Sequence, residues 1–131
     1  MGRRGAAVAE FSVCLPILIT IVLGSIEASR LIHVQHGLKT AAYEAARSIA
    51  DDRDISTSEV ETVVLSVLDA YQVTGGQVAL TPSALSSAQI GDLVTVTVTA
   101  PLASNRVISG WIPSWLLPDG ALSAQCTALR G

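Results

Sequence analysis

The chain has 131 residues, of which half are hydrophobic and 4% aromatic, and this length allows one domain beyond a membrane segment. The formal net charge is -3, and the basic residues after Arg4 are scattered. Because nucleic-acid binding requires clustered Lys and Arg, this pattern excludes a nucleic-acid partner. A disulfide between Cys14 and Cys126 would have to join an apolar helix to a distal domain, so we expect two free thiols and no zinc site.

The N-terminal part of the chain is apolar enough to cross a membrane. Residues 5–26 contain one charged residue, Glu10, and a helix of about 20 residues crosses a hydrocarbon core of roughly 30 Å. Arg3 and Arg4 precede the apolar run, which by the positive-inside rule keeps the N-terminus cytoplasmic and places the remainder outside. We therefore predict a single-pass membrane protein, with a transmembrane helix over residues 6–27 and an outer domain over residues 28–131.

Two other N-terminal signals are less consistent with the sequence. A secretory signal peptide has its small residues after the apolar stretch, whereas here they come before it, as Gly5, Ala6, Ala7 and Ala9. Cleavage after Gly24 or Ser25 stays an alternative. The residues before Cys14 lack the small side chains expected before a lipidated cysteine, so a buried structural thiol is the better interpretation.

Glu10 lies near the start of the predicted membrane helix, where a carboxylate is costly unless it is paired or hydrated. Cleavage after Gly5 would create an α-amine on Ala6, four residues before Glu10 and on the same helical face. That amine, in the same or a neighbouring subunit, would neutralise the carboxylate and set the helix register during assembly. The alternative is an uncleaved signal anchor whose Glu10 side chain reaches the lipid headgroups.

The residues from Arg3 to Phe11 resemble a prepilin leader: basic residues, Gly5, small residues, Glu10 and an aromatic. With Pro16 and Glu27 at matching offsets, the chain is similar to the TadE-like family of pseudopilins from tight-adherence (Tad) pilus systems, over roughly residues 3–50. The resemblance implies a leader of residues 1–5, cleavage between Gly5 and Ala6 by an aspartyl prepilin peptidase, and an assembly role for Glu10 and Phe11.

The resemblance also implies a location in a bacterial inner membrane, the function and the partners. We expect a non-catalytic minor pilin without a cofactor, involved in pilus assembly, adhesion or secretion. Its partners would be the prepilin peptidase, other pilin and pseudopilin subunits, the assembly platform and inner-membrane lipid. The alternative is an unprocessed single-pass anchor whose outer domain binds envelope partners.

Helical spacing of apolar residues continues beyond Glu27, and the sequence predicts one helix from Ala6 to Ala50, about 67 Å long. Pro16 lacks the N–H that a helix interior needs and predicts a kink or a local loss of helix; a tolerated membrane-helix proline is the alternative. Gly37 is a weak point of the helix. The capping box Ser56–Glu59 begins a second amphipathic helix over Thr57–Tyr71, closed by a turn at residues 75–76.

The apolar period then changes to about 2 residues, which is typical of strands. Leu93–Thr99 alternates valines with threonines and predicts a strand, with Gln77–Thr81 and Ala121–Leu129 as partners and a loop at Ser83–Gly91. The third strand should point four side chains inward: Leu122, Ala124, Cys126 and Ala128. We expect an α+β fold, in which a pilin-like outer domain combines two helices with a three-stranded antiparallel sheet.

None of the remaining candidate site residues belongs to a recognisable catalytic set. Trp111 and Trp115 lie between the second and third strands, where they form either an exposed partner contact or a cap over the open end of the core. His33 and His36 have a spacing that can chelate a metal, but no third ligand is apparent, so we expect solvent-facing side chains. Asp51, Asp52 and Asp54 form a loop-like charge cluster in which we expect no metal.

Overall fold

The computed structural model describes residues 3–108, Trp115 and residues 120–131, without the side chains of Arg3 and Arg4. It contains helices α1 (Arg3–Asp51) and α2 (Thr57–Ala70) and the strands β1 (Gln77–Thr81), β2 (Leu93–Pro101) and β3 (Ala121–Leu129). Two single-turn 3-10 helices, η1 (Leu85–Ser87) and η2 (Ala103–Asn105), lie in the connections. The strands form one antiparallel sheet in the order β1-β2-β3. The predicted α+β fold is confirmed.

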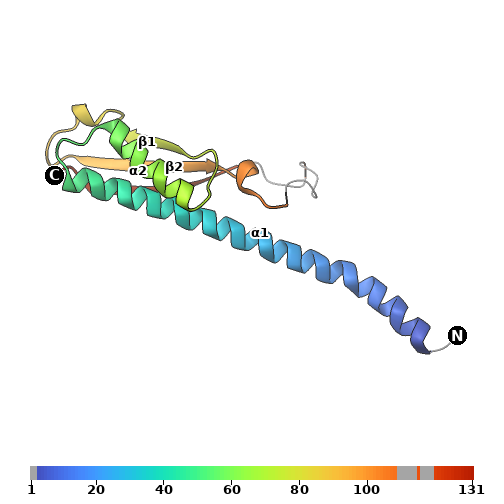
Figure 1. Ribbon diagram of the computed structural model, residues 1–131. Coiled ribbons are helices and arrows are strands. Elements are labelled where there is room, and N and C mark those ends of the chain that lie inside the picture. The colour runs from blue at the N-terminus through green and yellow to red at the C-terminus, as the bar shows by residue number, and fades with distance from the viewer. Residues whose placement is uncertain (1–2, 109–114, 116–119) are drawn as a thin grey trace.

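Helix α1 has two halves with different surroundings. Its N-terminal half, residues 3–26, projects away from the outer domain, and we call it the stem (Figure 1). Its C-terminal half packs against the sheet and α2. The predicted helix from Ala6 to Ala50 is confirmed and begins three residues earlier, at Arg3. The local loss of helix that Pro16 predicts is not found, because the helix continues through that residue. The ladder loses one hydrogen bond there, because proline has no N–H.

The core lies between the outer half of α1, α2 and the inner face of the sheet. Each element contributes the side chains that its sequence period predicts: Val34, Leu38 and Ile49 from α1, Val60, Val64 and Leu68 from α2, and Val94, Val96 and Val98 from β2. The inward face of β3 is also as predicted, with Ala124 buried and its three neighbours on that face half-buried. Small residues on α1 let the helix approach the sheet closely: Ala41, Ala42, Ala45 and Ala46.

Helix α2 has a defined cap at each end. The predicted capping box is present, because the Glu59 N–H donates to Ser56 Oγ and the Ser56 N–H donates to Glu59 Oε2. The bond from the Ser56 backbone lowers the pKa of the Glu59 carboxyl from its usual value. At the other end, Gln72 adopts a left-handed φ of 54°, and the Val73 N–H donates to the Leu68 carbonyl at 2.9 Å. These bonds form a Schellman motif, so the chain turns before residues 75–76.

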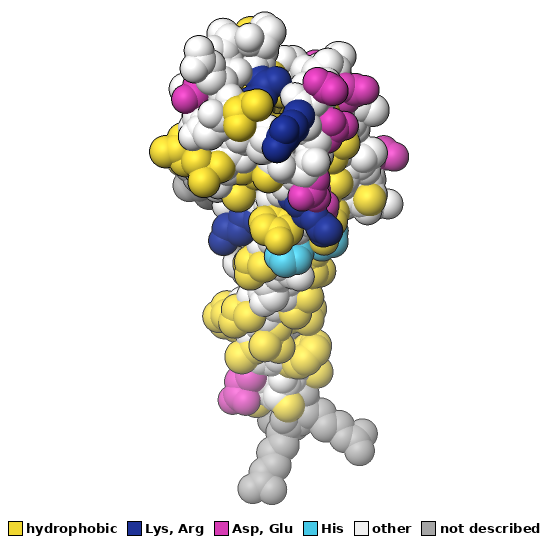
Figure 2. Space-filling view, turned by 90° about the vertical axis from the view of Figure 1, so that its left-hand side faces the viewer, with side chains coloured by type: hydrophobic (Ala, Val, Ile, Leu, Met, Phe, Trp, Pro, Cys, Tyr) yellow, Lys and Arg dark blue, Asp and Glu magenta, His cyan; other side chains and the backbone are white. Residues whose placement is uncertain are grey.

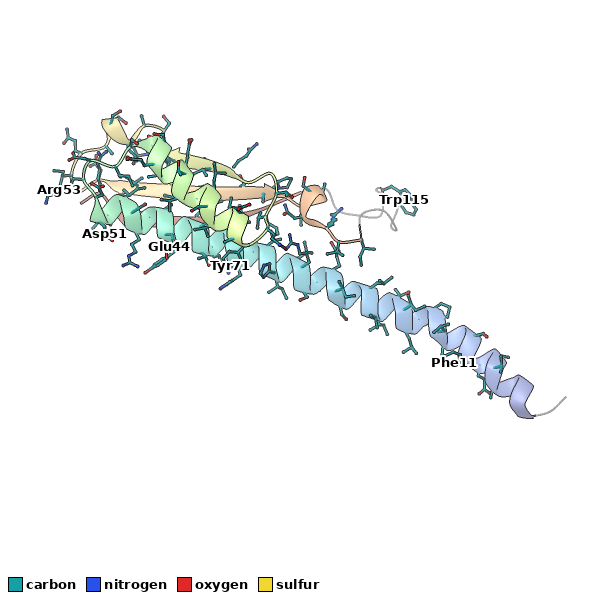
Figure 3. All side chains as sticks on the ribbon, in the orientation of Figure 1. Phe11, Glu44, Asp51, Arg53, Tyr71 and Trp115 are labelled. Atoms are coloured by element: carbon teal, nitrogen blue, oxygen red, sulfur yellow. The ribbon has the colours of Figure 1, made fainter. Side chains whose placement is uncertain are left out.

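Tyr71, at the C-terminal end of α2, packs directly on Gly37 of α1. A Cβ atom at Gly37 would lie 2.9 Å from both Cβ and Cγ of Tyr71, closer than two carbon atoms can pack. The glycine, which weakens the helix by about 1 kcal/mol relative to alanine, is therefore what lets the two helices approach here. Figure 3 shows Tyr71 against α1 where α2 ends.

Asn105 is a buried polar residue that ties η2 to the end of α2. It is 2% exposed. Its Oδ1 accepts from the Thr74 N–H, and its Nδ2 donates to the carbonyls of Thr74 and Pro101, each at 2.9 Å. Because these bonds satisfy the buried amide, Asn105 fixes the path of the chain as it leaves β2.

We expect Gly37→Ala to lower the free energy of unfolding of the outer domain by about 1–2 kcal/mol, since the overpacking cost exceeds the gain in helix propensity. The measurement is thermal unfolding of the full chain in detergent micelles, followed by circular dichroism. Gly24→Ala is the matched control, because nothing lies within 4 Å of a Cβ atom there. A Gly37→Ala protein as stable as the control would contradict the packing argument.

Candidate processing and assembly segment

The predicted functional segment, residues 5–11, lies in the first turns of α1 and is exposed along its whole length. A Cβ atom added at Gly5 would meet nothing within 4 Å, so the fold does not require a glycine there. Ala6 and Glu10 are one helical turn apart and share a face. Phe11 is 60% exposed and projects from the stem (Figure 3).

Glu10 is the acidic residue of an otherwise apolar stem. The described part of the chain offers it no hydrogen bond and no ion pair. Figure 2 shows its surroundings: hydrophobic side chains cover the stem, and one acidic side chain lies near its free end. The helix over Gly5–Asp51 is long and apolar enough to cross a membrane, and its most apolar stretch is exposed.

Glu27 marks the other end of the apolar run, and the sequence did not reveal what it contacts. Its Oε2 accepts hydrogen bonds from the backbone N–H groups of Val107 and Ile108, at 3.1 and 3.3 Å. Its Oε1 is buried without a partner among the described residues. Because the donors lie 80 residues further along the chain, local patterns could show the carboxylate but not its role. Glu27 holds the chain that follows η2 against the stem.

The structure describes one of the two tryptophans, Trp115. Trp111 lies outside the described residues, and Trp115 is 82% exposed. Trp115 therefore does not cap the core, and the exposed-contact interpretation stays a prediction for both residues.

His33 and His36 are held by Tyr71, with ring centroids 5.3 and 5.9 Å from its ring. Their side chains are exposed, as expected. Over the described residues, no three His, Cys, Asp or Glu side chains gather as metal ligands. In the predicted charge cluster, Asp51 pairs with Arg47 at 3.4 Å, and an Asp52 oxygen accepts from the Asp54 N–H.

Cys14 and Cys126 are free thiols, as expected from the sequence. Cys14 is exposed on the stem, so its predicted burial does not occur within this chain. Cys126 is half-buried on the inner face of β3, where Cys126 pairs with Val96 in the sheet register.

We expect Glu27→Ala to release residues 107–108, because two backbone donors lose their acceptor. The Ile108 donor is buried, and a buried donor left without a partner costs about 1–3 kcal/mol, so its amide exchange should rise by roughly fivefold or more. Hydrogen-exchange mass spectrometry of the full chain in micelles measures this rise. Glu61→Ala, an exposed position on α2, should leave the exchange unchanged. Equal exchange in both variants would show that Glu27 does not hold this segment.

Comparison with known proteins finds a match to the same part of the chain. Residues 5–47, about a third of the chain, match the family model described as TadE-like protein. This range covers the exposed stem, Glu27 and the part of α1 that packs on the outer domain. Neither a curated protein nor a solved structure matches the chain. The resemblance drawn from the sequence is confirmed: over residues 5–47 this chain is similar to TadE-like proteins.

Proposed function

We propose that this protein is a non-catalytic minor pilin of a Tad-type pilus, cleaved between Gly5 and Ala6 and built into the assembly through Glu10. The observation that carries the proposal is the lone carboxylate of Glu10 on an exposed apolar stem, inside the segment that matches the TadE-like model. In this proposal residues 6–27 span the inner membrane, the N-terminus is cytoplasmic, and residues 28–131 lie outside.

Processing at Gly5 is supported by how little the fold needs that glycine. Space for a Cβ atom is open there, so the glycine serves something other than packing. Gly5 also lies in the first turn of α1, where the first N–H groups have no intrahelical acceptor. Glycine lowers helix stability by about 1 kcal/mol relative to alanine. The first turn can therefore open readily, which gives a membrane peptidase an extended backbone to cut.

Assembly through Glu10 follows from the charge that cleavage creates. The new α-amine on Ala6 is positive near neutral pH, and Glu10 lies one turn away on the same face. In lipid an unpaired carboxylate is unfavourable, so an amine from the same or an adjacent subunit stabilises the packed helices. Where the amine comes from an adjacent subunit, only one register of the two helices brings it next to Glu10. Phe11 adds an exposed aromatic surface next to this pair, suited to contact with a neighbouring helix.

The outer domain contributes shape and contacts in this proposal. Trp115 is exposed beyond the end of β2, and a large exposed aromatic side chain is typical of a protein–protein contact. We propose Trp111 and Trp115 as contacts to another pilus subunit or to the envelope. Incorporation into an extracellular pilus would expose them there.

The first test is the mature N-terminus. In cells with an active prepilin peptidase, we expect the intact mass of the protein to begin at Ala6. Gly5→Val should retain residues 1–5, because a branched side chain occupies the cleavage position. Gly24→Val is the matched control, since the space at Gly24 is equally open, and it should be processed normally. A wild-type mass that keeps Met1 or Gly2 would favour the unprocessed anchor instead.

The second test removes the assembly charge. We expect Glu10→Ala to insert into the membrane and to be cleaved normally, while its incorporation into pili falls to background. Immunoblots of membrane and sheared pilus fractions measure the two steps separately. Glu61→Ala removes an exposed carboxylate from α2 and should leave incorporation unchanged. Normal incorporation of the Glu10→Ala protein would rule out pairing with the Ala6 amine.

A further inference from the structure

We propose that Arg30 and His33 form a binding site for the phosphate group of an anionic membrane phospholipid, at the point where the stem meets the outer domain. The inference rests on the membrane placement proposed above and is independent of cleavage at Gly5. An open groove of about 610 Å³ lies at this point. Its lining includes Ile21, Val22, Ile26, Ser29, Arg30 and His33.

The groove changes from apolar to basic along the helix axis. Ile21, Val22 and Ile26 line its stem end and are 61%, 57% and 46% exposed. Arg30 and His33 line the end next to the outer domain. A phospholipid presents acyl chains and then a phosphate in the same order along the membrane normal.

The depth of Arg30 matches the headgroup layer. With residues 6–27 across the hydrocarbon core of roughly 30 Å, the outer end of the core lies near Glu27. Arg30, three residues further, lies about 4.5 Å beyond that end. The headgroup layer extends about 5–8 Å beyond the core on each side. Lys39, nine residues further, lies about 13 Å beyond Arg30 along the helix axis. From residue 28 to residue 43 the sequence has no acidic residue.

Both proposed ligands are held in place by the C-terminal end of α2. Arg30 Nη2 donates to the Gln72 carbonyl at 2.6 Å, which uses one of the five guanidinium N–H donors. The His33 ring lies 5.3 Å from that of Tyr71. A guanidinium that is already fixed loses less side-chain entropy when it binds, and its remaining donors suit the geometry of a phosphate. This fixed geometry distinguishes the site from a freely moving interfacial arginine.

A second copy of this chain is a weaker candidate for the groove. Three residues of its lining, Ile21, Val22 and Ile26, lie within residues 6–27, the segment proposed to cross the membrane. Lipid acyl chains surround the stem at that depth. The exposed apolar lining also suits acyl chains.

The experiment is native mass spectrometry of the uncleaved full chain released from detergent micelles that contain equal amounts of phosphatidylglycerol and phosphatidylcholine. We expect wild-type protein to retain phosphatidylglycerol preferentially, and Arg30→Gln to lower that retention about fivefold, the effect of one basic residue near an anionic surface. Arg30→Lys should fall between them, because it keeps the charge and loses the planar fork. Lys39→Gln is the matched control and should behave as wild type.

Three results would overturn the proposal. Equal retention of the two lipids by the wild-type chain would do so whether or not any variant folds. An equal loss of phosphatidylglycerol retention in Lys39→Gln and Arg30→Gln would show that the preference depends on overall positive charge and not on a site at Arg30. A dimer that dissociates in Arg30→Gln, with lipid retention unchanged, would assign the groove to a second copy. Because the chain measured is uncleaved, failure of processing at Gly5 leaves this test intact.

Discussion

A single unbroken helix has to satisfy two different surroundings, and the rest of the structure depends on it. Every backbone hydrogen bond of α1 is made within the helix apart from those at its ends and at Pro16, which is the condition for crossing lipid. The stem is apolar on all sides, whereas the outer half keeps one apolar face for α2 and the sheet. The core of the outer domain is thus built on the continuation of the stem, and displacement of one is transmitted to the other.

The junction between stem and outer domain is held by contacts from distant parts of the chain. Tyr71 packs on Gly37, the Gln72 carbonyl accepts from Arg30, and Glu27 accepts from the chain after η2. A flexible junction would let the outer domain move freely on its anchor. These contacts, spread between Glu27 and Gly37 of α1, fix its orientation on the stem. A filament subunit requires such a fixed geometry, because errors in orientation accumulate along an assembly.

The chemistry proposed for this protein is confined to α1, and the outer domain supports it by position. In the proposed function, cleavage at Gly5 would create a charge, Glu10 would neutralise it, and the apolar stem would make the pair selective by excluding water. At the other end of the stem, Arg30 and His33 would meet the headgroup layer. The two ends would then act on different partners, a neighbouring subunit and a lipid, so each could be altered without the other.

The sequence determined the helices and strands, because each has a strong local signal: the apolar run, the Ser56–Glu59 capping box and the alternation of valine and threonine in β2. It also identified Gly5 and Glu10, whose proposed roles depend on neighbours within one helical turn. Only the tertiary structure decided what Gly37 and Glu27 contact. Their partners, Tyr71 and the amides of residues 107–108, are 34 and 80 residues away, and no local period encodes such a distance. Pro16 by itself is compatible with a broken or a continuous helix, and the structure shows that α1 continues through it.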